Sequence, residues 1–195
     1  MIKKRICLII PILIGINTGI CQNLRFDSYS TSEGLAHSNT IGLHVDDLGF
    51  TLIGTDDGLS IYDGVGFKTL QRKHDDDNSL LDNRILAIEE DDDGIIWLGS
   101  DLGLTRYDRR QEQFRRYVTD PRNDNSLLGD NICAILFDAS GRLWLGSSGG
   151  LSLYRPDTDD FLNFRHDAYD QNSLVAGEVK CITEHPSGEI WIKST

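Results

Sequence analysis

Residues 92–108 read DDGIIWLGSDLGLTRYD, and residues 138–155 repeat the pattern as DASGRLWLGSSGGLSLYR. Trp97, Trp144 and Trp191 mark the repeat, because each lies 47 residues from the next. A fixed period near this length indicates one supersecondary unit that is used repeatedly. The stretch therefore predicts a repeat architecture and argues against a self-contained catalytic domain.

Each copy contains four short segments with the character of β-strands. In the second copy, residues 83–91 read NRILAIEED, and four positions of this segment, 85–88, are apolar on both faces, which suggests a strand buried on both sides. Asp93-Gly94 is a strong hairpin signal, and three further strand-like segments follow before the next copy. Four antiparallel strands in a repeat of this length form the blade of a β-propeller. We therefore predict an all-β fold, a β-propeller of four-stranded antiparallel blades.

The repeats divide residues 22–195 into a partial propeller of about three and a half blades. The predicted approximate bounds are 31–78, 79–125, 126–172 and, for a blade with two of its four strands, 173–195. A propeller has about four to eight blades. We therefore expect this chain to be a fragment of a larger protein whose remaining strands follow residue 195.

Residues 24–30, LRFDSYS, resemble the fourth strand of a blade, because Phe26 and Tyr29 correspond to Phe114 and Tyr117. The segment precedes any first, second or third strand. We therefore predict that it closes the ring by completing the last blade, which removes exposed strand edges.

The repeat signature consists of tryptophan, glycine and tyrosine positions with expected structural roles. A glycine inside a strand marks a bulge or the close approach of another backbone, and a glycine that ends a turn adopts a positive φ without strain. The aromatic residue at the end of the third strand is expected to pack between blades. The signature residues are Trp97, Gly99, Gly103, Tyr107, Trp144, Gly146, Gly150, Tyr154 and Trp191.

Two copies depart from this signature. Leu52 takes the place of the tryptophan in the first copy, and Lys193 takes the place of the strand glycine in the fourth. The Lys193 substitution leaves open whether the fourth copy has the local bulge. The loop before each copy ends in Asn-Ser-Leu, first at Asn78 to Leu80, and we interpret it as a structural crossover in which these side chains bond nearby backbone.

The first residues have the pattern of an export signal. Basic residues at positions 3–5 precede the apolar run Ile6 to Ile16, which is shorter than the roughly 20 residues of a membrane-spanning helix. We predict a signal peptide over residues 1–21 that is cleaved after Cys21, and hence a periplasmic location. The alternatives are lipidation of Cys21 and an uncleaved anchor.

The composition is acidic, with 31 Asp and Glu against 19 Lys and Arg and a net charge of -12. Such a surface disfavours nucleic acid and anionic membranes as partners. Cys133 and Cys181 occupy different positions in the repeat, so no disulfide between them is expected, and we interpret Cys181 as a small buried apolar residue.

No constellation for chemistry emerges from the sequence. The acidic runs at 75–77, 91–93 and 159–160 lack the alternating ligands of a calcium loop, and we interpret them as solvated, turn-forming residues. No Cys/His cluster, nucleophile elbow, P-loop or dinucleotide fingerprint is present. We therefore expect no catalytic, cofactor-binding or metal-binding residues in this chain, and we expect that it is not an enzyme. Its ligand-binding residues stay open.

The pattern D-x-x-G-x-x-W-[LI]-G-[ST]-x-x-G-L-x-x-Y resembles the two-component regulator propeller repeat, and FDSYSTSEGLAHSNTI (26–41) resembles the start of such sensors. The resemblance implies the N-terminal periplasmic sensor region of a hybrid two-component system that combines a histidine kinase with a response regulator. It further implies an oligosaccharide ligand from carbohydrate breakdown. The complete protein would be a homodimer, anchored in the inner membrane, with its kinase module outside this chain.

Two other functions remain open on the sequence alone. The chain could belong to a secreted propeller that binds glycans or acts as a polysaccharide lyase, or it could be a non-functional gene fragment. Activity of the complete protein on a polysaccharide, without an attached kinase, would favour the secreted propeller.

Overall fold

The computed structural model describes residues 26–195, which form strands connected by turns and loops, with one short 3-10 helix, η1 (Thr31–Glu33). The predicted signal peptide and Cys21 lie outside the described residues. Between residues 26 and 195, no helix is long and apolar enough to cross a membrane.

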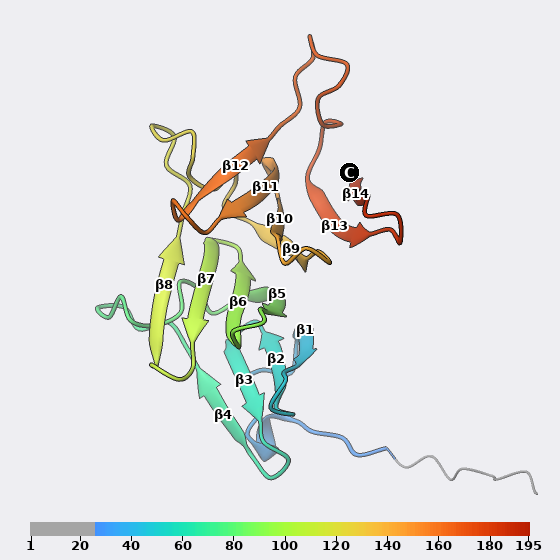
Figure 1. Ribbon diagram of the computed structural model, residues 1–195. Helices are drawn as coiled ribbons and strands as arrows, with labels where there is room; N and C mark the ends of the chain where they lie inside the picture. Colours follow the sequence, from blue (N-terminus) through green and yellow to red (C-terminus); the bar gives the residue numbers. More distant parts are fainter. Residues whose placement is uncertain (1–25) are drawn as a thin grey trace, which may run out of the picture.

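Three sheets have four antiparallel strands each, and the strands follow sequence order within every sheet (Figure 1). Blade 1 contains β1 (Thr40–Val45), β2 (Thr51–Thr55), β3 (Gly58–Tyr62) and β4 (Phe67–Leu70). Blade 2 contains β5 (Ile85–Glu90), β6 (Ile95–Ser100), β7 (Gly103–Asp108) and β8 (Gln113–Tyr117). Blade 3 contains β9 (Ile132–Phe137), β10 (Leu143–Ser147), β11 (Gly150–Arg155) and β12 (Asp160–Phe164). The partial blade 4 contains β13 (Val179–Glu184) and β14 (Ile190–Ser194).

This arrangement confirms the predicted all-β fold of four-stranded antiparallel blades in an incomplete propeller. The blades meet along their first strands, since β1 contacts β5, β5 contacts β9, and β9 contacts β13. Figure 1 shows the sheets following one another from blade 1 in cyan to blade 4 in red.

The N-terminal segment that was expected to close the ring has no strand pairing at residues 26–30. Instead, Tyr29 packs against the outer part of blade 1. Its ring lies 5.0 Å from that of Tyr62 and 5.7 Å from that of Phe67, and the hydroxyls of Tyr29 and Tyr62 are 2.9 Å apart. Because the described residues do not include a last blade to which the segment could be added, ring closure stays a prediction.

Every first strand carries an irregularity opposite the glycine position of the second strand. The register shifts between Ile85 and Ala87 in blade 2, and the same shift lies between Val179 and Cys181 in blade 4. Blade 4 therefore keeps the bulge although Lys193 replaces the glycine there, which resolves the question that the sequence left open.

The strand glycines lie where the backbone of the next blade approaches. A Cβ atom on Gly99 would be 2.4 Å from the carbonyl oxygen of Ile132, and one on Gly146 would be 2.6 Å from the carbonyl oxygen of Val179. These separations are too short for a side chain. The glycines thus allow the first strand of the next blade to lie close to the second strand of the preceding blade at the bulge.

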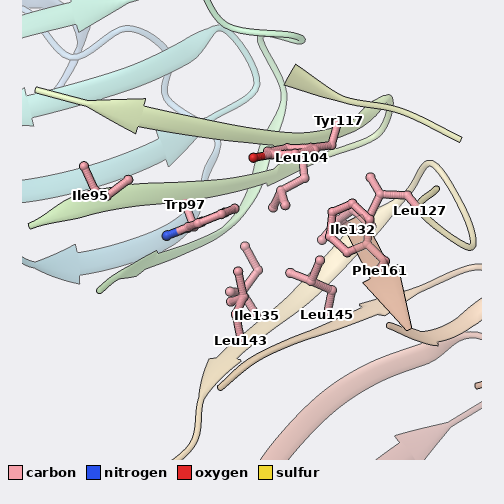
Figure 2. Close-up of a cluster of buried hydrophobic side chains, with 10 residues drawn as sticks. All are labelled: Ile95, Trp97, Leu104, Tyr117, Leu127, Ile132, Ile135, Leu143, Leu145 and Phe161. Carbon is pink, nitrogen blue, oxygen red and sulfur yellow. The ribbon is translucent and has the colours of Figure 1, made fainter. Parts of the chain in front are cut away.

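The hydrophobic core lies between successive blades. Figure 2 shows the cluster between blades 2 and 3, where Trp97 and Leu104 meet Ile132, Leu145 and Phe161. An equivalent cluster between blades 1 and 2 contains Leu52, Leu59, Leu80, Leu98 and Tyr107, among others. Fully burying an aliphatic or aromatic side chain contributes about 1.5–3 kcal/mol, so the side chains of each cluster together stabilise the contact between neighbouring blades.

The crossover loops have the expected local hydrogen bonds. The hydroxyl of Ser126 accepts the N–H of Asp120 at 2.9 Å and donates to the carbonyl of Asn123 at 2.8 Å, and Ser173 makes the same pair with Asp167 and Asp170.

The interpretation of Cys181 as a buried residue is wrong. Cys133 and Cys181 are both free thiols, and Cys181 is exposed. The equivalent Ala87 and Ala134 are covered by the blade that follows theirs. No described blade follows β13, and the side chain of Cys181 is therefore open to solvent.

Candidate functional site

The turns of the propeller gather at two opposite ends. Because the strands alternate in direction, the turns between first and second strands lie at the same end as those between third and fourth strands. We call the turn between the first and second strands of a blade its AB turn, and we call this end of the propeller the AB end. The turns between second and third strands and the crossover loops lie at the opposite end.

An aspartate begins the AB turn of blade 2 and connects it to the tryptophan strand. One oxygen of Asp91 accepts the N–H groups of Asp93 and Ile95, at 3.1 and 2.9 Å. The other oxygen accepts the indole N–H of Trp97 at 3.0 Å. A single carboxylate thus closes the turn and fixes the indole that forms the interblade core.

Blade 3 repeats this arrangement with an additional donor. The indole N–H of Trp144 donates to Oδ2 of Asp138 at 2.8 Å, and Nε of Arg142 donates to the same oxygen at 2.6 Å. Burial acts to raise the pKa of Asp138, but the hydrogen bonds from Trp144, Arg142 and Ser140 outweigh it and hold the pKa below its usual value. The guanidinium of Arg142 also lies 5.4 Å from the centre of the Trp144 ring.

In blade 1, the donor to the turn aspartate comes from the neighbouring blade 2. Asp46 caps the turn, yet Leu52 supplies no indole N–H. Nη1 of Arg109, from blade 2, donates to Oδ2 of Asp46 at 2.5 Å, and the Asp46 side chain has no exposed surface. The missing tryptophan is therefore offset by an arginine that connects two blades.

Glu90 extends this polar network between blades 1 and 2. It accepts the N–H of Asp47 at 2.9 Å, and its carboxylate lies 3.7 Å from Nε2 of His44 and 3.9 Å from Nη2 of Arg109. Burial raises the pKa of the adjacent Glu89, an effect that His44 partly opposes. The inner part of this interface is thus filled by charged side chains that satisfy one another.

A cleft of about 730 Å³ opens at the AB end between blades 2 and 3, which we call the blade 2–3 cleft. Two substitutions at repeat positions distinguish it from the interface between blades 1 and 2. Pro156 stands at the position of Arg109, and Phe137 stands at the position of Glu90. The cleft is lined by Glu90, Asp91, Asp92, Asp93, Trp97, Phe137, Asp138, Ala139, Ser140, Gly141, Arg142, Leu143, Tyr154 and Pro156.

The walls of this cleft combine aromatic surface with carboxylates. The rings of Trp97 and Tyr154 are 5.0 Å apart, and those of Trp97 and Phe137 are 6.5 Å apart. Asp92 and Asp93 are exposed at the rim. Ligand sites in proteins commonly have volumes of roughly 300–1,000 Å³ and pair apolar walls with a few polar groups, which makes this cleft the candidate site.

Asp159 lies beside the cleft in a cluster that the sequence did not predict. Its Oδ1 accepts the hydroxyls of Tyr117 and Tyr154, each at 2.7 Å, and its other oxygen pairs with the guanidinium of Arg115. Burial, followed by the neighbouring Tyr154 hydroxyl, raises the pKa of Tyr117. The interpretation of Asp159 as a solvated residue is wrong, because its carboxylate is held between blades 2 and 3 by Tyr117, Tyr154 and Arg115. Its backbone is in the left-handed region, with a φ of 54°.

A second cleft, of about 540 Å³, lies between blade 3 and the partial blade 4 and is lined by Trp144, Leu151, Phe164 and Ile192, among others. At the preceding interface, the equivalent Trp97 and Leu104 are covered by Phe161 and Tyr154. This second cleft thus contains apolar surface of blade 3 whose equivalent in blade 2 is covered by the next blade.

The signature residues predicted from the sequence differ in burial. Trp97 and Tyr107 are buried between blades, whereas Trp191 is 59% exposed and stacks on His185 at 5.7 Å. Within residues 26–195, no group of three or more His, Cys, Asp or Glu side chains could hold a metal ion.

The substitutions that distinguish the two interfaces were not predicted from the sequence, because they are departures from the repeat. Arg109, Phe137 and Pro156 stand where other copies have different residue types. A comparison of the copies for their differences, rather than for their shared residues, would have singled out these positions.

Comparison with known proteins agrees with the repeat. Residues 79–101 and 126–149 match the family model described as two component regulator propeller. Each match runs from the crossover serine to the end of the tryptophan strand. The chain therefore carries two repeats of this kind, which confirms the predicted resemblance. No curated protein matches the chain.

Solved structures share the fold at low sequence identity. The extracellular domain described as that of the hybrid two component system BT3049 from B. thetaiotaomicron superimposes with a TM-score of 0.77 and 21% identity, over 85% of this chain and 23% of that one. The extracellular domain of BT4673 from the same organism, described as a one component system in one structure and as a hybrid two component system in another, gives 0.73 and 21%, over 89% of this chain and 22–23% of that one. Virginiamycin B lyase from Staphylococcus aureus gives 0.55 and 14%, over 80% of this chain and 49% of that one. The chain thus spans less than a quarter of the first two structures.

Proposed function

We propose that this chain is the exported, ligand-sensing propeller portion of a hybrid two-component sensor. The observation that carries the proposal is the pair of two component regulator propeller repeats at residues 79–101 and 126–149. The fold supports it, because extracellular domains described as those of the hybrid systems BT3049 and BT4673 superimpose better than the lyase does.

The proposed ligand is an oligosaccharide from carbohydrate breakdown, and the proposed output is a change in a kinase module encoded elsewhere in the same protein. A ligand shifts an equilibrium between two arrangements only by binding them with different affinity. A ligand in a cleft between two blades meets this requirement, since it contacts both blades and can bind two relative positions of them with different affinity.

The location and assembly of the complete protein are part of the same proposal. Export by residues 1–21 would place the propeller in the periplasm, and an inner-membrane anchor with a homodimeric arrangement would connect it to the kinase.

The test is an assay of the complete protein that contains this sequence, reconstituted in membrane vesicles. We expect the reading frame to encode a membrane-spanning helix and a histidine kinase core, and we expect autophosphorylation to change when an oligosaccharide mixture is added to the propeller side. Polysaccharide cleavage by a protein without a kinase core would overturn the proposal and favour the secreted propeller enzyme instead.

A further inference from the structure

We propose that the blade 2–3 cleft binds a saccharide that carries a positive charge, such as an amino sugar. This inference rests on the proposed sensing function and assigns the ligand class and the site. Its basis is a comparison of two successive interfaces within the same chain.

At the AB end of the interface between blades 1 and 2, a cationic side chain is held between acidic groups. There the guanidinium of Arg109 lies between two acidic groups, 2.5 Å from Oδ2 of Asp46 and 3.9 Å from Oε1 of Glu90. The guanidinium also lies over an aromatic ring, since its central carbon is 5.2 Å from the centre of the Phe50 ring. A cation between carboxylates and an aromatic face thus occupies this part of the interface.

The next interface lacks that cation. Pro156 replaces Arg109, and a proline has neither charge nor a hydrogen-bond donor on its side chain. The position of Glu90 is taken by Phe137, which adds apolar wall. The cleft at this interface has a volume of about 730 Å³, against about 440 Å³ for the cleft that Arg109 lines between blades 1 and 2.

The acidic groups around the cleft are compensated only in part, since Glu90 lies 3.9 Å from Arg109 whereas Asp92 and Asp93 have no cationic partner among the described residues. The lining of the cleft contains five acidic side chains and one basic side chain, Arg142, which is already paired with Asp138. Asp91 is satisfied by Trp97 and two backbone N–H groups. Asp92 and Asp93 project from the turn with exposed carboxylates that accept no hydrogen bond from the described residues.

The two kinds of wall suit a pyranose ring with an amine. The aromatic edges of Phe137 and Tyr154 can cover the apolar face of the ring, while the carboxylates of Asp92 and Asp93 accept hydrogen bonds from hydroxyl and ammonium groups. The same carboxylates repel uronates and sulfated sugars. We therefore expect amine-bearing saccharides to bind more tightly than neutral ones, and neutral ones more tightly than acidic ones.

The experiment is calorimetric titration of the full chain at low salt with three disaccharides of similar size: the glucosamine disaccharide, cellobiose and digalacturonate. The double variant Asp92→Asn/Asp93→Asn should weaken binding of the glucosamine disaccharide about fivefold or more, because two charge contacts are lost. Binding of cellobiose should change less, and added salt should weaken only the amine-bearing ligand.

Two further variants make the result specific to the cleft. Pro156→Arg restores the arginine of the preceding interface and should abolish binding of both the glucosamine disaccharide and cellobiose by filling the cleft. Asp75→Asn/Asp124→Asn removes two exposed carboxylates from the crossover loops at the opposite end and should leave every affinity unchanged.

The proposal is overturned if the glucosamine disaccharide does not bind, if digalacturonate binds more tightly, or if neither cleft variant changes the affinity. A complete protein that signals in response to an oligosaccharide while the cleft variants have no effect would overturn this site and leave the sensing function standing. Binding at the cleft in a protein without a kinase core would support this site and overturn the sensing function.

Discussion

The guanidinium of Arg109 lies 2.5 Å from the carboxylate of Asp46 and occupies the hydrogen-bond acceptor that an indole N–H takes in the next two blades. The two residues are 63 positions apart and belong to different blades. In blade 1, an ion pair between two blades therefore takes the place of the indole–aspartate hydrogen bond that blades 2 and 3 form within one blade.

Removal of this arginine should destabilise the fold strongly. Arg109→Ala leaves the Asp46 carboxylate buried without its cation, and loss of one partner of a buried ion pair costs about 3–5 kcal/mol. Urea unfolding followed by tryptophan fluorescence measures the change. Arg110→Ala, on the exposed neighbour, should stay within about 0.5 kcal/mol of the parent chain.

The same variant offers a rescue that tests the cause. Leu52→Trp introduces the indole that blades 2 and 3 use, and in the Arg109→Ala background it should restore a large part of the lost stability. If the double variant is no more stable than Arg109→Ala alone, an indole cannot substitute for the arginine, and the proposed equivalence fails.

The two buried tryptophans should differ in their sensitivity to substitution. Trp97→Phe removes the side-chain donor to Oδ2 of Asp91, whereas after Trp144→Phe the same oxygen of Asp138 still accepts from Arg142. A hydrogen bond to a charged group contributes about 1.5–3 kcal/mol. We expect Trp97→Phe to lower the free energy of unfolding by about 1–2 kcal/mol more than Trp144→Phe does. Equal losses would show that packing volume alone decides the cost.

The glycine that faces the next blade should not tolerate a methyl group. The Cβ atom in Gly99→Ala would meet the Ile132 carbonyl oxygen at 2.4 Å, so blades 2 and 3 must separate. Overpacking of this kind costs about 1–3 kcal/mol or more. Gly66→Ala is the matched control, since no atom lies within 4 Å of its added Cβ and its φ is not positive. That control should be neutral or slightly stabilising in thermal unfolding.

Acid should weaken the protein partly through Asp138. The pKa of this carboxyl is lower in the folded chain than the roughly 3.9 of an unfolded aspartate. Its contribution to stability is therefore present above that unfolded value and is lost as the pH falls through the folded pKa. Asp138→Asn should be less stable than the parent at pH 7, and the difference between the two should shrink at pH 3.

Urea midpoints at pH 7 and pH 3 measure this difference. Asp92→Asn is the control, because the Asp92 carboxylate is exposed and accepts no hydrogen bond from the described residues. It should match the parent chain at either pH. A gap between Asp138→Asn and the parent that stays constant with pH would contradict the assignment.

The repeat alone predicted the blades, because each copy carries its own strand periodicity, hairpin turns and glycine positions. These are local signals, and β6, β7, β10 and β11 follow them closely. The segment 26–30 shows the boundary of such reasoning. Its match of Phe26 and Tyr29 to Phe114 and Tyr117 is compatible with a strand, but a strand requires a partner, and Tyr29 packs on Tyr62 and Phe67 instead.

The acidic runs show the same boundary for the site. From the sequence, Asp91, Asp93 and Asp159 were one class of solvated turn residue. The structure separates them, since Asp91 holds an indole, Asp93 lies at the rim of the cleft, and Asp159 accepts two tyrosine hydroxyls.

The sequence by itself determined the blade, the turn chemistry and the order of the strands, since these depend on neighbours within a few residues. Only the tertiary structure decided which departures from the repeat compensate one another. Arg109 faces Asp46 because blade 2 packs on blade 1, and the cleft at the next interface lies where Pro156 and Phe137 of blade 3 face the AB turn of blade 2. Such pairings depend on contacts between blades, and no periodicity within one blade contains them.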